Sequence, residues 1–518
     1  MNYQPDYKKL SSADERPNNK SAPELINSAN RLEISSAAVL YNELSLADMA
    51  HVIMLTETEI IPWTSGQKLL AALMEVHAIP VSKFPFDPIF GDIYDCRELY
   101  LNKLAPDVAG WLRTGRARRE ATNIAYSLAM RRRLIALLKA QGQLALTIVA
   151  KAEKHLKTLM PDYTYLHQAQ PTTFAHYLLG FVYPILRDYA RLRACFLRTN
   201  LSPGGIGSVN GSRLPINRKR LAELLGFDGV VHHTRDAMWQ ADMPIEASSN
   251  AVTLLINLSR LAEDLQIWTT QEFNLVELDC GYSRNSVIMP QKKNPYSLNY
   301  IRGLTNVTIG HLVAMANVGR TPSGQPDNRI FAYGVVPRLI DKTLEAVQLM
   351  AGVLNTLKVN TSNMTRTMKL GYSQATDLAE VIMLAVGLPY LTAHKVVQHV
   401  LRTAIERDIP ADQISVKMIE KAGKEVVGDK VTISPETLKK ALSPQEIINT
   451  RNGIGCVGTE PMKEMIAQCR ERAAEIQTWV DETEYRLTIA EVKLISLVKK
   501  MINSSQNKDK EIEGASKT

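Results

Sequence analysis

The chain has 518 residues, of which 45% are hydrophobic and 22% are charged, so it can bury a large core and form two or three domains. The formal net charge of +8 comes from acidic and basic residues that alternate along most of the length, without the concentrated basic stripe of a nucleic-acid-binding protein. No uninterrupted apolar run approaches the ~18 residues of a membrane span, so we expect a protein that binds neither nucleic acid nor membrane.

Five cysteines lie far apart in the sequence and form no C-x-x-C pair, which argues against a disulfide framework and against a zinc knuckle. The first ~28 residues lack the apolar core of a signal peptide, so we expect a cytoplasmic protein. The adjacent His232 and His233 have no third ligand at a metal-binding spacing. We therefore predict no metal and no other cofactor.

The two ends of the chain, residues 1–28 and 503–518, are polar and poor in large apolar residues. We predict that both are disordered tails. Between them we predict three helical domains. These are an N-terminal domain over residues 29–121, a central bundle over 122–370 and a C-terminal domain over 371–502.

Long segments with helical spacing dominate the middle of the chain. Apolar residues recur every three or four positions from Leu254 to Trp268 and from Ile340 to Leu354, and residues 124–157 and 175–200 also have the pattern of long helices. Alternating β-branched strands are scarce, which predicts an all-α fold built on a long-helix bundle. A helix of ~25 residues is ~37 Å long and usually buries its remaining apolar stripe against a partner subunit, so we expect a homo-oligomer.

A polar loop, residues 281–295, ends in the sequence NSVIMPQKKNP and stands directly before a helical pattern. Removing a proton from a carbon next to a carboxylate needs a nearby base, and it needs groups that stabilise the developing negative charge. Ser286, Lys292 and Asn294 are residues of these types. In a simpler interpretation, Asn294 caps the following helix, Pro295 is its first residue, and the lysines are only solvated.

Several segments of the chain resemble the aspartase/fumarase superfamily. The loop resembles the GSSxMPxKxN loop of this superfamily, and its MPQKKNP sequence is the form typical of argininosuccinate lyases. Residues 114–120 (TGRARRE) look like the TGRSRND segment, residues 163–171 (YTYLHQAQP) like YTHLQRAQP, and residues 258–264 (LSRLAED) like the LSRxAED helix. The resemblance implies three all-α domains, a tetramer with central helices at its core, and active sites that are each assembled from three subunits.

The resemblance also assigns roles to single residues of this sequence. Ser286 takes the place of the catalytic base, and Lys292 and Asn294 fall where the superfamily binds the substrate carboxylate and stabilises the carbanion. Arg118 and Thr164 match residues that contact the dicarboxylate, and a guanidinium group suits a carboxylate well.

Other positions depart from the superfamily pattern. Tyr165 stands at the histidine of the THLQ motif and Tyr94 at the histidine of an EDIH motif, while Ala117 and Arg119 replace a serine and an asparagine of the succinate pocket. We predict that Tyr165 is catalytic and that Tyr94, Arg119 and Gln170 bind substrate. Tyrosine has an unperturbed pKa of ~10 and carries protons less readily than histidine at neutral pH, so the identity of the proton donor stays open.

Residues 319–331 (GRTPSGQPDNRIF) occupy the stretch where argininosuccinate lyases carry STYNKDLQEDK, whose tyrosine, glutamine and lysine hold the arginine half of the substrate. None of the three is evident here. We therefore predict an enzyme of the argininosuccinate lyase type that eliminates an amine-like group from an N-substituted aspartate other than argininosuccinate and releases fumarate, or catalyses the reverse addition. The alternatives are elimination of another group, such as nitrite from nitrosuccinate, and a catalytically inactive scaffold.

Overall fold

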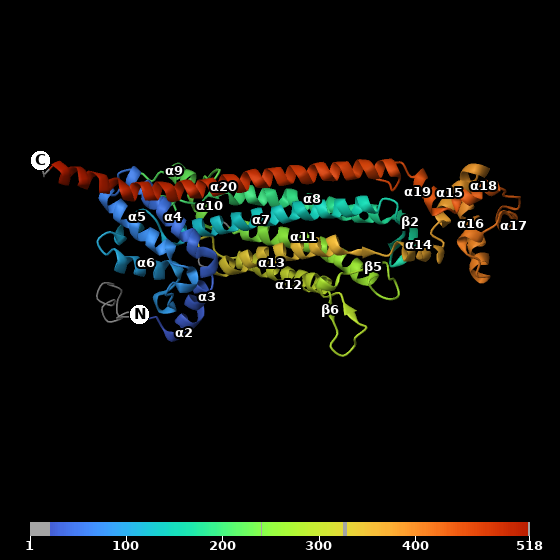
Figure 1. Cartoon of the computed structure of the whole chain (residues 1–518), viewed down its shortest axis with the longest axis horizontal. Helices are drawn as coiled ribbons and strands as arrows, with labels where there is room; N and C mark the ends of the chain where they lie inside the picture. The colour runs from blue at the N-terminus through green and yellow to red at the C-terminus, as the bar shows by residue number, and fades with distance from the viewer. Residues whose placement is uncertain (1–20, 240, 325–328, 516–518) are drawn as a thin grey trace.

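The computed structural model of the chain describes residues 21–239, 241–324 and 329–515. Long helices run side by side along an elongated molecule, with the N-terminal helices at one end and residues 375–450 at the other (Figure 1). Strands in the described ranges form only two-stranded pairs. The prediction of an all-α fold is therefore confirmed.

The N-terminal region combines short helices with three longer ones. Its elements are α2 (Pro23–Leu25), η1 (Ile26–Asn30), α3 (Arg31–Ile34), α4 (Ala37–Glu57), α5 (Trp63–Ala78), η2 (Val81–Lys83), η3 (Pro88–Phe90), α6 (Ile93–Leu104) and η4 (Ala109–Arg113). Buried leucines, isoleucines and methionines of α4 and α5 belong to its apolar cluster. Asp48 on α4, itself buried, accepts hydrogen bonds from Arg97 (3.0 Å) and Arg116 (2.6 Å), which ties α4 to two later segments.

Five long helices form the central bundle. They are α7 (Arg118–Lys154), α8 (Phe174–Thr199), α11 (Asp242–Trp268), α12 (Tyr296–Val318) and α13 (Ile330–Thr356). Helix α7 packs against α8 and α13, and α11 packs against α8 and α12. The residues predicted to form a seam between Leu254 and Trp268 are buried in the largest apolar cluster, because their spacing places them on one face of α11.

Helix α7 is the one described helix that is long and apolar enough, by length and composition alone, to cross a membrane. Inside the chain, 61% of its most apolar window is buried. Neighbouring helices therefore cover this apolar surface, as they do in the core helix of a soluble protein.

The C-terminal region has an apolar cluster of its own, built from residues between Leu378 and Leu442. Its helices are α14 (Thr361–Lys369), α15 (Ala375–Val386), α16 (Tyr390–Glu406), η7 (Ala411–Gln413), α17 (Val416–Val427), α18 (Pro435–Ala441) and α19 (Pro444–Thr450). The last helix, α20 (Thr459–Ala515), leaves this region and runs back along the bundle to the N-terminal end (Figure 1). Its buried apolar residues belong to the other two clusters, so its apolar face packs against the bundle and the N-terminal region.

Most of the described residues in the two predicted tails are helical. Residues 23–28 lie in α2 and η1, and residues 503–515 continue α20. The amide of Gln67 donates hydrogen bonds to the Met501 carbonyl (2.8 Å) and to the Ser504 hydroxyl (2.9 Å), which holds the start of the C-terminal tail against α5. The remaining tail residues, 1–20 and 516–518, lie outside the described ranges.

Two of the strand pairs are hairpins that carry predicted site residues. The pairs are β1 (Leu159–Thr164) with β2 (His167–Thr173), β3 (Leu201–Ser202) with β4 (Gly229–Val230), β5 (Val276–Glu277) with β8 (Lys358–Val359), and β6 (Arg284–Asn285) with β7 (Lys293–Asn294). The short elements between them are α9 (Arg218–Leu224), α10 (Thr234–Trp239) and η5 (Cys280–Tyr282). The β6–β7 hairpin projects from one side of the bundle (Figure 1).

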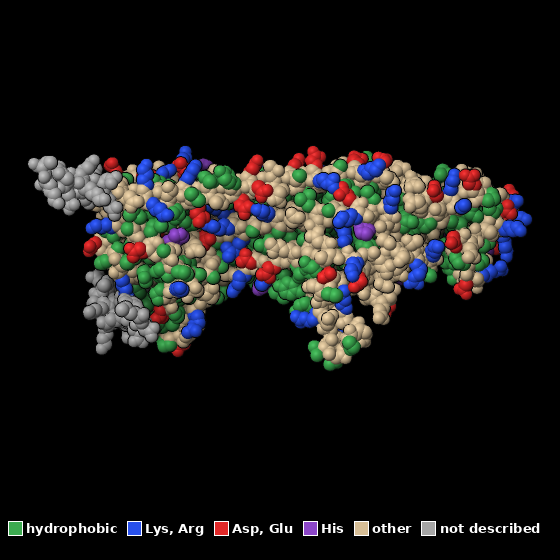
Figure 2. Space-filling view, viewed as in Figure 1, with side chains coloured by type: hydrophobic (Ala, Val, Ile, Leu, Met, Phe, Trp, Pro, Cys, Tyr) green, Lys and Arg blue, Asp and Glu red, His purple; other side chains and the backbone are tan. Residues whose placement is uncertain are grey.

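Apolar side chains remain exposed along α12. Figure 2 shows them as a green patch on the lower face of the bundle, and Val307, Ile309 and Val313 are exposed in this helix. A contiguous apolar patch on a long helix usually marks a contact with another chain. This face is therefore suited to an interface between subunits.

Candidate active site

Ser286 and Lys292 lie at the two ends of the loop between β6 and β7. The backbone N–H of Ser286 donates to the Lys292 carbonyl (3.2 Å), and the N–H of Lys292 donates to the Met289 carbonyl (3.0 Å). These bonds fold the loop on itself and keep the two residues adjacent at its base.

The hydroxyl oxygen of Ser286 accepts a hydrogen bond from the Met289 N–H (3.1 Å). A backbone N–H that points at an oxygen stabilises negative charge on it, so this contact favours loss of the hydroxyl proton. Lys292 is exposed, and its ammonium group is a second source of positive charge in the same loop. The loop thus contains a hydroxyl group and the donors that would stabilise its deprotonated form. The catalytic roles of Ser286 and Lys292 stay predictions.

Asn294 closes the base of the same hairpin. Its side-chain amide donates to the Arg284 carbonyl (2.9 Å), and the Arg284 guanidinium lies 3.8 Å from the centre of the Tyr296 ring. Helix α12 begins at Tyr296 after Pro295 and has no side-chain cap. The expectation that Asn294 caps this helix is therefore wrong, whereas the exposed Lys292 agrees with a solvated lysine.

The tip of this hairpin exposes apolar side chains in a row. Val287 is 100% exposed and Ile288 is 84% exposed, and Met289 is also exposed. Exposed apolar groups of this kind usually mark a surface that another molecule covers. The predicted base thus lies on a projecting loop of the single chain and not inside one of its cavities.

Tyr165 lies at the tip of the β1–β2 hairpin. Thr164 pairs with His167, which leaves Tyr165 and Leu166 as a two-residue turn with φ angles of 53° and 61°. Two positive φ angles define a type I′ turn. The Tyr165 side chain is 97% exposed and Thr164 is exposed beside it, whereas Gln170 lies farther along β2 and is half-buried.

Arg118 and Arg119 begin helix α7 and face carboxylates of their own chain. Arg118 pairs with Asp95 (2.7 Å) and Asp92 (3.5 Å), and Arg119 pairs with Glu33 (2.7 Å). Burial raises the pKa of Asp92, and burial together with the neighbouring Asp92 carboxylate raises the pKa of Asp95. Both guanidinium groups predicted to bind substrate are thus already compensated in the single chain.

Tyr94, on α6, is only 4% exposed. The Arg116 guanidinium is 5.9 Å from the centre of its ring, and burial raises the pKa of its hydroxyl. The gap beside it, lined in part by Asp92 and Thr122, has a volume of about 10 Å³, no larger than one water molecule. The single chain therefore shows no opening through which a substrate reaches Tyr94.

The nine predicted residues form three groups that one chain does not unite. Helix α7 has 37 residues, and its length of about 55 Å separates the first group from the second. The third group stands on the projecting hairpin (Figure 1). The groups are Tyr94, Arg118 and Arg119; Thr164, Tyr165 and Gln170; and Ser286, Lys292 and Asn294.

Glu120, fully buried at the start of α7, is not among the residues that the sequence pointed to. Its carboxylate accepts a hydrogen bond from the Gly205 N–H (2.6 Å), and the N–H groups of Ile206 and Gly207 also face it. Burial raises its pKa to about 7, although Arg116 and these N–H groups act in the opposite direction. The sequence carried two signals of this contact: Glu120 follows two arginines directly, and a glycine-rich turn at residues 203–212 lies far along the chain.

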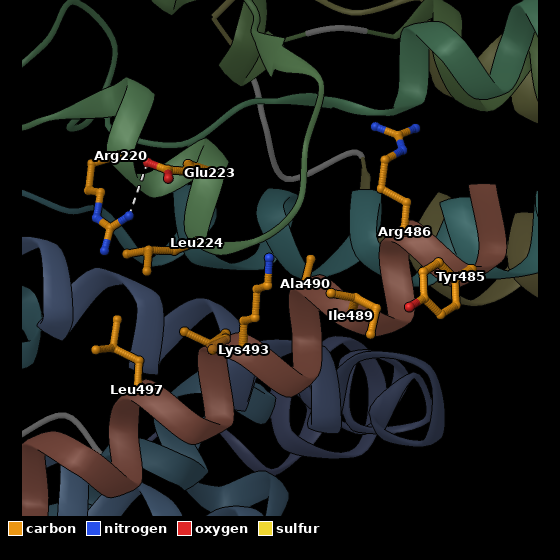
Figure 3. A pocket seen from close by; sticks show the side chains of 10 residues that line it. Arg220, Glu223, Leu224, Tyr485, Arg486, Ile489, Ala490, Lys493 and Leu497 are labelled. Carbon is orange, nitrogen blue, oxygen red and sulfur yellow. Dashed lines mark ion pairs between the residues drawn. The ribbon is translucent and has the colours of Figure 1, made fainter. Parts of the chain in front are cut away.

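Among the described residues, the predicted site residues belong neither to a metal site nor to the larger cavity. In the ranges that the structure describes, no three His, Cys, Asp or Glu side chains lie close enough to hold a metal ion. A cavity of about 440 Å³ lies between α9 and α20, where Lys493 extends toward α9 and Arg220 pairs with Glu223 (Figure 3). None of the predicted site residues lines this cavity.

Known proteins resemble this chain along most of its length. A family model described as lyase matches residues 31–310, and one described as argininosuccinate lyase C-terminal matches residues 372–449. The argininosuccinate lyase of Methanocaldococcus jannaschii is 33% identical over 84% of this chain and 89% of its own length. The chain belongs to the aspartase/fumarase superfamily and is of the argininosuccinate lyase type. The resemblance inferred from the motifs is thereby confirmed.

Two solved structures are similar to this lyase over nearly all of their length. EDDS lyase in complex with formate is 30% identical, with a TM-score of 0.84, and the match covers 94% of this chain and 97% of that one. A variant of EDDS lyase with bound fumarate is 29% identical, also with a TM-score of 0.84, over 97% and 99% of the two chains. This lyase is accordingly a fumarate-releasing carbon–nitrogen lyase.

Proposed function

We propose that this lyase eliminates an amine from an N-substituted aspartate other than argininosuccinate, or catalyses the reverse addition, with Ser286 as the base. The observation that carries the proposal is the hydrogen bond from the Met289 N–H to the Ser286 hydroxyl (3.1 Å) in the loop that matches the catalytic motif. A serine becomes a base only where negative charge on its oxygen is stabilised. The N–H of Met289 and the ammonium group of Lys292 are groups that stabilise it.

In the proposed reaction, Ser286 takes a proton from the carbon β to the departing nitrogen. The electron pair left on that carbon is delocalised into the adjacent carboxylate, where Lys292 and Asn294 stabilise the charge. The pair then forms the double bond of fumarate as the carbon–nitrogen bond breaks. The amine leaves with the electrons of that bond and takes a proton from Tyr165 or from water, so that the products are fumarate and a free amine.

We further propose that the enzyme is a cytoplasmic homotetramer whose active sites are shared between subunits. The exposed apolar tip at Val287 and Ile288, the exposed apolar face of α12 and the ~55 Å between the first two groups of site residues all support this assembly. Arg118, Arg119, Thr164, Gln170 and Tyr94 are the proposed substrate-binding residues.

A substrate other than argininosuccinate is supported by residues 319–331. Residues 325–328 lie outside the described ranges, and polar groups on both sides of them are engaged by the protein itself. Arg329 donates to the Asn123 side chain (2.9 Å), and Ser323 accepts hydrogen bonds from Arg235 through its carbonyl (3.2 Å) and hydroxyl (3.1 Å). In the described part of this stretch, Ser323 and Arg329 therefore make structural contacts with the protein itself.

A second candidate is the elimination of nitrite from nitrosuccinate. Tyr165 stands where the superfamily has a histidine, so the proton carrier of the superfamily is absent from this position. Nitrite is a stable anion and leaves without a proton, so it needs no such donor. This observation favours the candidate, although the carbon–nitrogen lyase relatives favour an amine.

A substrate panel tests the proposal. Purified enzyme is incubated with a set of N-substituted aspartates, with argininosuccinate and with nitrosuccinate, and fumarate formation is followed by its ultraviolet absorbance. We expect turnover of one or more N-substituted aspartates, with the Ser286→Ala variant as the inactive control. Rapid cleavage of argininosuccinate alone, or release of nitrite alone, would contradict the proposed substrate class.

A further inference from the structure

One short segment, residues 273–278, contacts both hairpins that carry predicted catalytic residues. On one side, the Phe273 ring lies 5.8 Å from the ring of Tyr163, in the strand that leads to Tyr165. On the other side, Lys293 of β7 reaches the segment at Glu277 and Leu278. We call residues 273–278 the brace segment.

The brace segment is itself fixed to the body of the protein. Its strand β5 pairs with β8. The amide of Asn363 on α14 donates to the carbonyls of Phe273 (2.8 Å) and Asn274 (3.0 Å), and the N–H of Asn360 donates to the Leu275 carbonyl (2.9 Å). These contacts hold the backbone at three successive positions, so the segment is a fixed reference for whatever binds to it.

The β6–β7 hairpin, in contrast, has little support of its own. Its strands form two residue pairs, Arg284 with Asn294 and Asn285 with Lys293. So short a two-stranded ladder is not stable by itself in water. Its direction relative to the bundle depends on side chains that reach back from the hairpin to the body.

Lys293 makes that contact with both of its neighbours on the brace segment. Its ammonium group binds the Glu277 carboxylate (3.0 Å) and donates a hydrogen bond to the Leu278 carbonyl. We propose that Lys293 is a positioning residue for the elimination reaction, whose contacts with the brace segment aim the loop that carries Ser286 and Lys292. The inference rests on the proposed role of Ser286.

Lys293 and Glu277 each stabilise the charged form of the other. Partial burial lowers the pKa of Lys293, but the hydrogen bond and charge of Glu277 outweigh it, so its pKa lies above the usual value. The same contact lowers the pKa of Glu277. Both groups are charged across the neutral range, and the anchor does not weaken near neutral pH.

Two substitutions at this position test the proposal. Lys293→Met keeps the length of the side chain but removes the charge and the donors, whereas Lys293→Arg keeps both. We expect Lys293→Met to lower kcat by about 10- to 100-fold, because a misplaced catalytic group is costly, while KM changes by less than about threefold. Lys293→Arg is expected to restore most of kcat, and hydrogen exchange of residues 286–292 is expected to accelerate only in Lys293→Met.

Lys342→Met is the matched control, since it removes the lysine of an exposed ion pair with Glu345 on α13 (2.8 Å) and touches neither hairpin. The proposal is overturned if Lys293→Met has the kcat and the hydrogen exchange of this control. If Lys293→Met does not fold, the test uses Glu277→Gln, which removes the charge of the partner carboxylate. A smaller loss of kcat with faster exchange in the loop supports the proposal, and wild-type values for both overturn it.

These outcomes are separable from failure of the proposed function. If no N-substituted aspartate is turned over, the substrate proposal fails, but exchange in the loop still reports whether Lys293 fixes it. Hydrogen exchange of residues 286–292, measured on the wild type and on Lys293→Met with and without fumarate, then replaces kcat. Equal exchange in the two proteins overturns the positioning role.

Discussion

Ser286 is half-buried at the base of a loop whose tip is exposed. The loop supplies a hydrogen bond to the hydroxyl from Met289 and a neighbouring cation at Lys292, while its tip remains exposed. These groups stabilise a negative oxygen but do not by themselves exclude water. We infer that exclusion of water comes from another subunit.

At the residue scale, Ser286→Ala removes the proposed base and leaves the backbone bonds of the loop in place. We expect kcat to fall on the order of 10³-fold or more, because no neighbouring side chain replaces the hydroxyl. Melting temperature and molar mass are expected to stay at wild-type values, since the side chain lies in a projecting loop. A variant with more than about one tenth of wild-type kcat would show that another group is the base.

Glu120 gives a prediction for pH. Because burial raises its pKa from 4.5 to about 7, the folded protein holds this proton more tightly than the unfolded chain does. The contribution of Glu120 to stability therefore falls as pH rises from about 4.5 through about 7 and is constant above that range. Glu120→Gln cannot ionise and lacks this loss.

Melting temperatures of the wild type and Glu120→Gln, measured at a series of pH values, check this expectation. The difference between them should move in favour of the variant between pH 4.5 and about 7 and then level off. If the difference in melting temperature between the two proteins stays constant through this pH range, Glu120 keeps an ordinary pKa.

At the element scale, the β1–β2 hairpin has an unfavourable turn. Type I′ turns favour Asn-Gly because both central residues have positive φ, but here they are Tyr165 and Leu166. A non-glycine residue in this region costs about 1–2 kcal/mol. Strain of this kind persists where a side chain is needed for another reason, and the exposed Tyr165 phenol is the candidate for that reason.

The double substitution Tyr165→Asn with Leu166→Gly tests whether the strained turn is kept because Tyr165 is needed for catalysis. We expect the melting temperature to stay equal or rise, because the new turn removes the strain, whereas turnover is lost. Tyr165→Phe separates the hydroxyl from the ring. Full activity of Tyr165→Phe would show that this residue is not the proton donor, and full activity of the double variant would show that the tip has no catalytic role.

At the scale of the whole molecule, shared active sites predict complementation between inactive subunits. Ser286→Ala and Thr164→Ala alter groups on different hairpins, and each is expected to inactivate a homo-oligomer. Mixed oligomers, made by dissociation and reassembly of the two variants, are expected to regain part of the wild-type activity because some sites then contain only intact groups. Mixed oligomers that native mass spectrometry detects but that stay inactive would contradict shared sites.

The exposed face of α12 predicts the assembly itself. The wild type is expected to have a molar mass four times that of its 57.7 kDa chain by light scattering. Charges at two exposed positions, Val307→Asp with Val313→Asp, are expected to dissociate the oligomer, because an aspartate cannot be buried in an apolar interface without a partner. A double variant that remains tetrameric and active would place the interface elsewhere.

The sequence by itself determined the all-α fold, the positions of the long helices and the family. Helical periodicity is local, and the residues from Leu254 to Trp268 lie on one face of α11 wherever that helix packs. The sequence also identified the loop with Ser286 and Lys292, because a loop that carries reacting groups needs particular residue types at a fixed spacing. The roles of these residues and the domain boundaries stay predictions.

Only the tertiary structure decided how these parts are arranged. It showed that α20 returns along the bundle, that Arg118 and Arg119 are paired with Glu33, Asp92 and Asp95, and that Lys293 ties the loop to the brace segment. Each of these contacts joins residues far apart in the sequence. Periodicity and motifs report on neighbours along the chain, whereas ion pairs and packing depend on which distant segments meet in space.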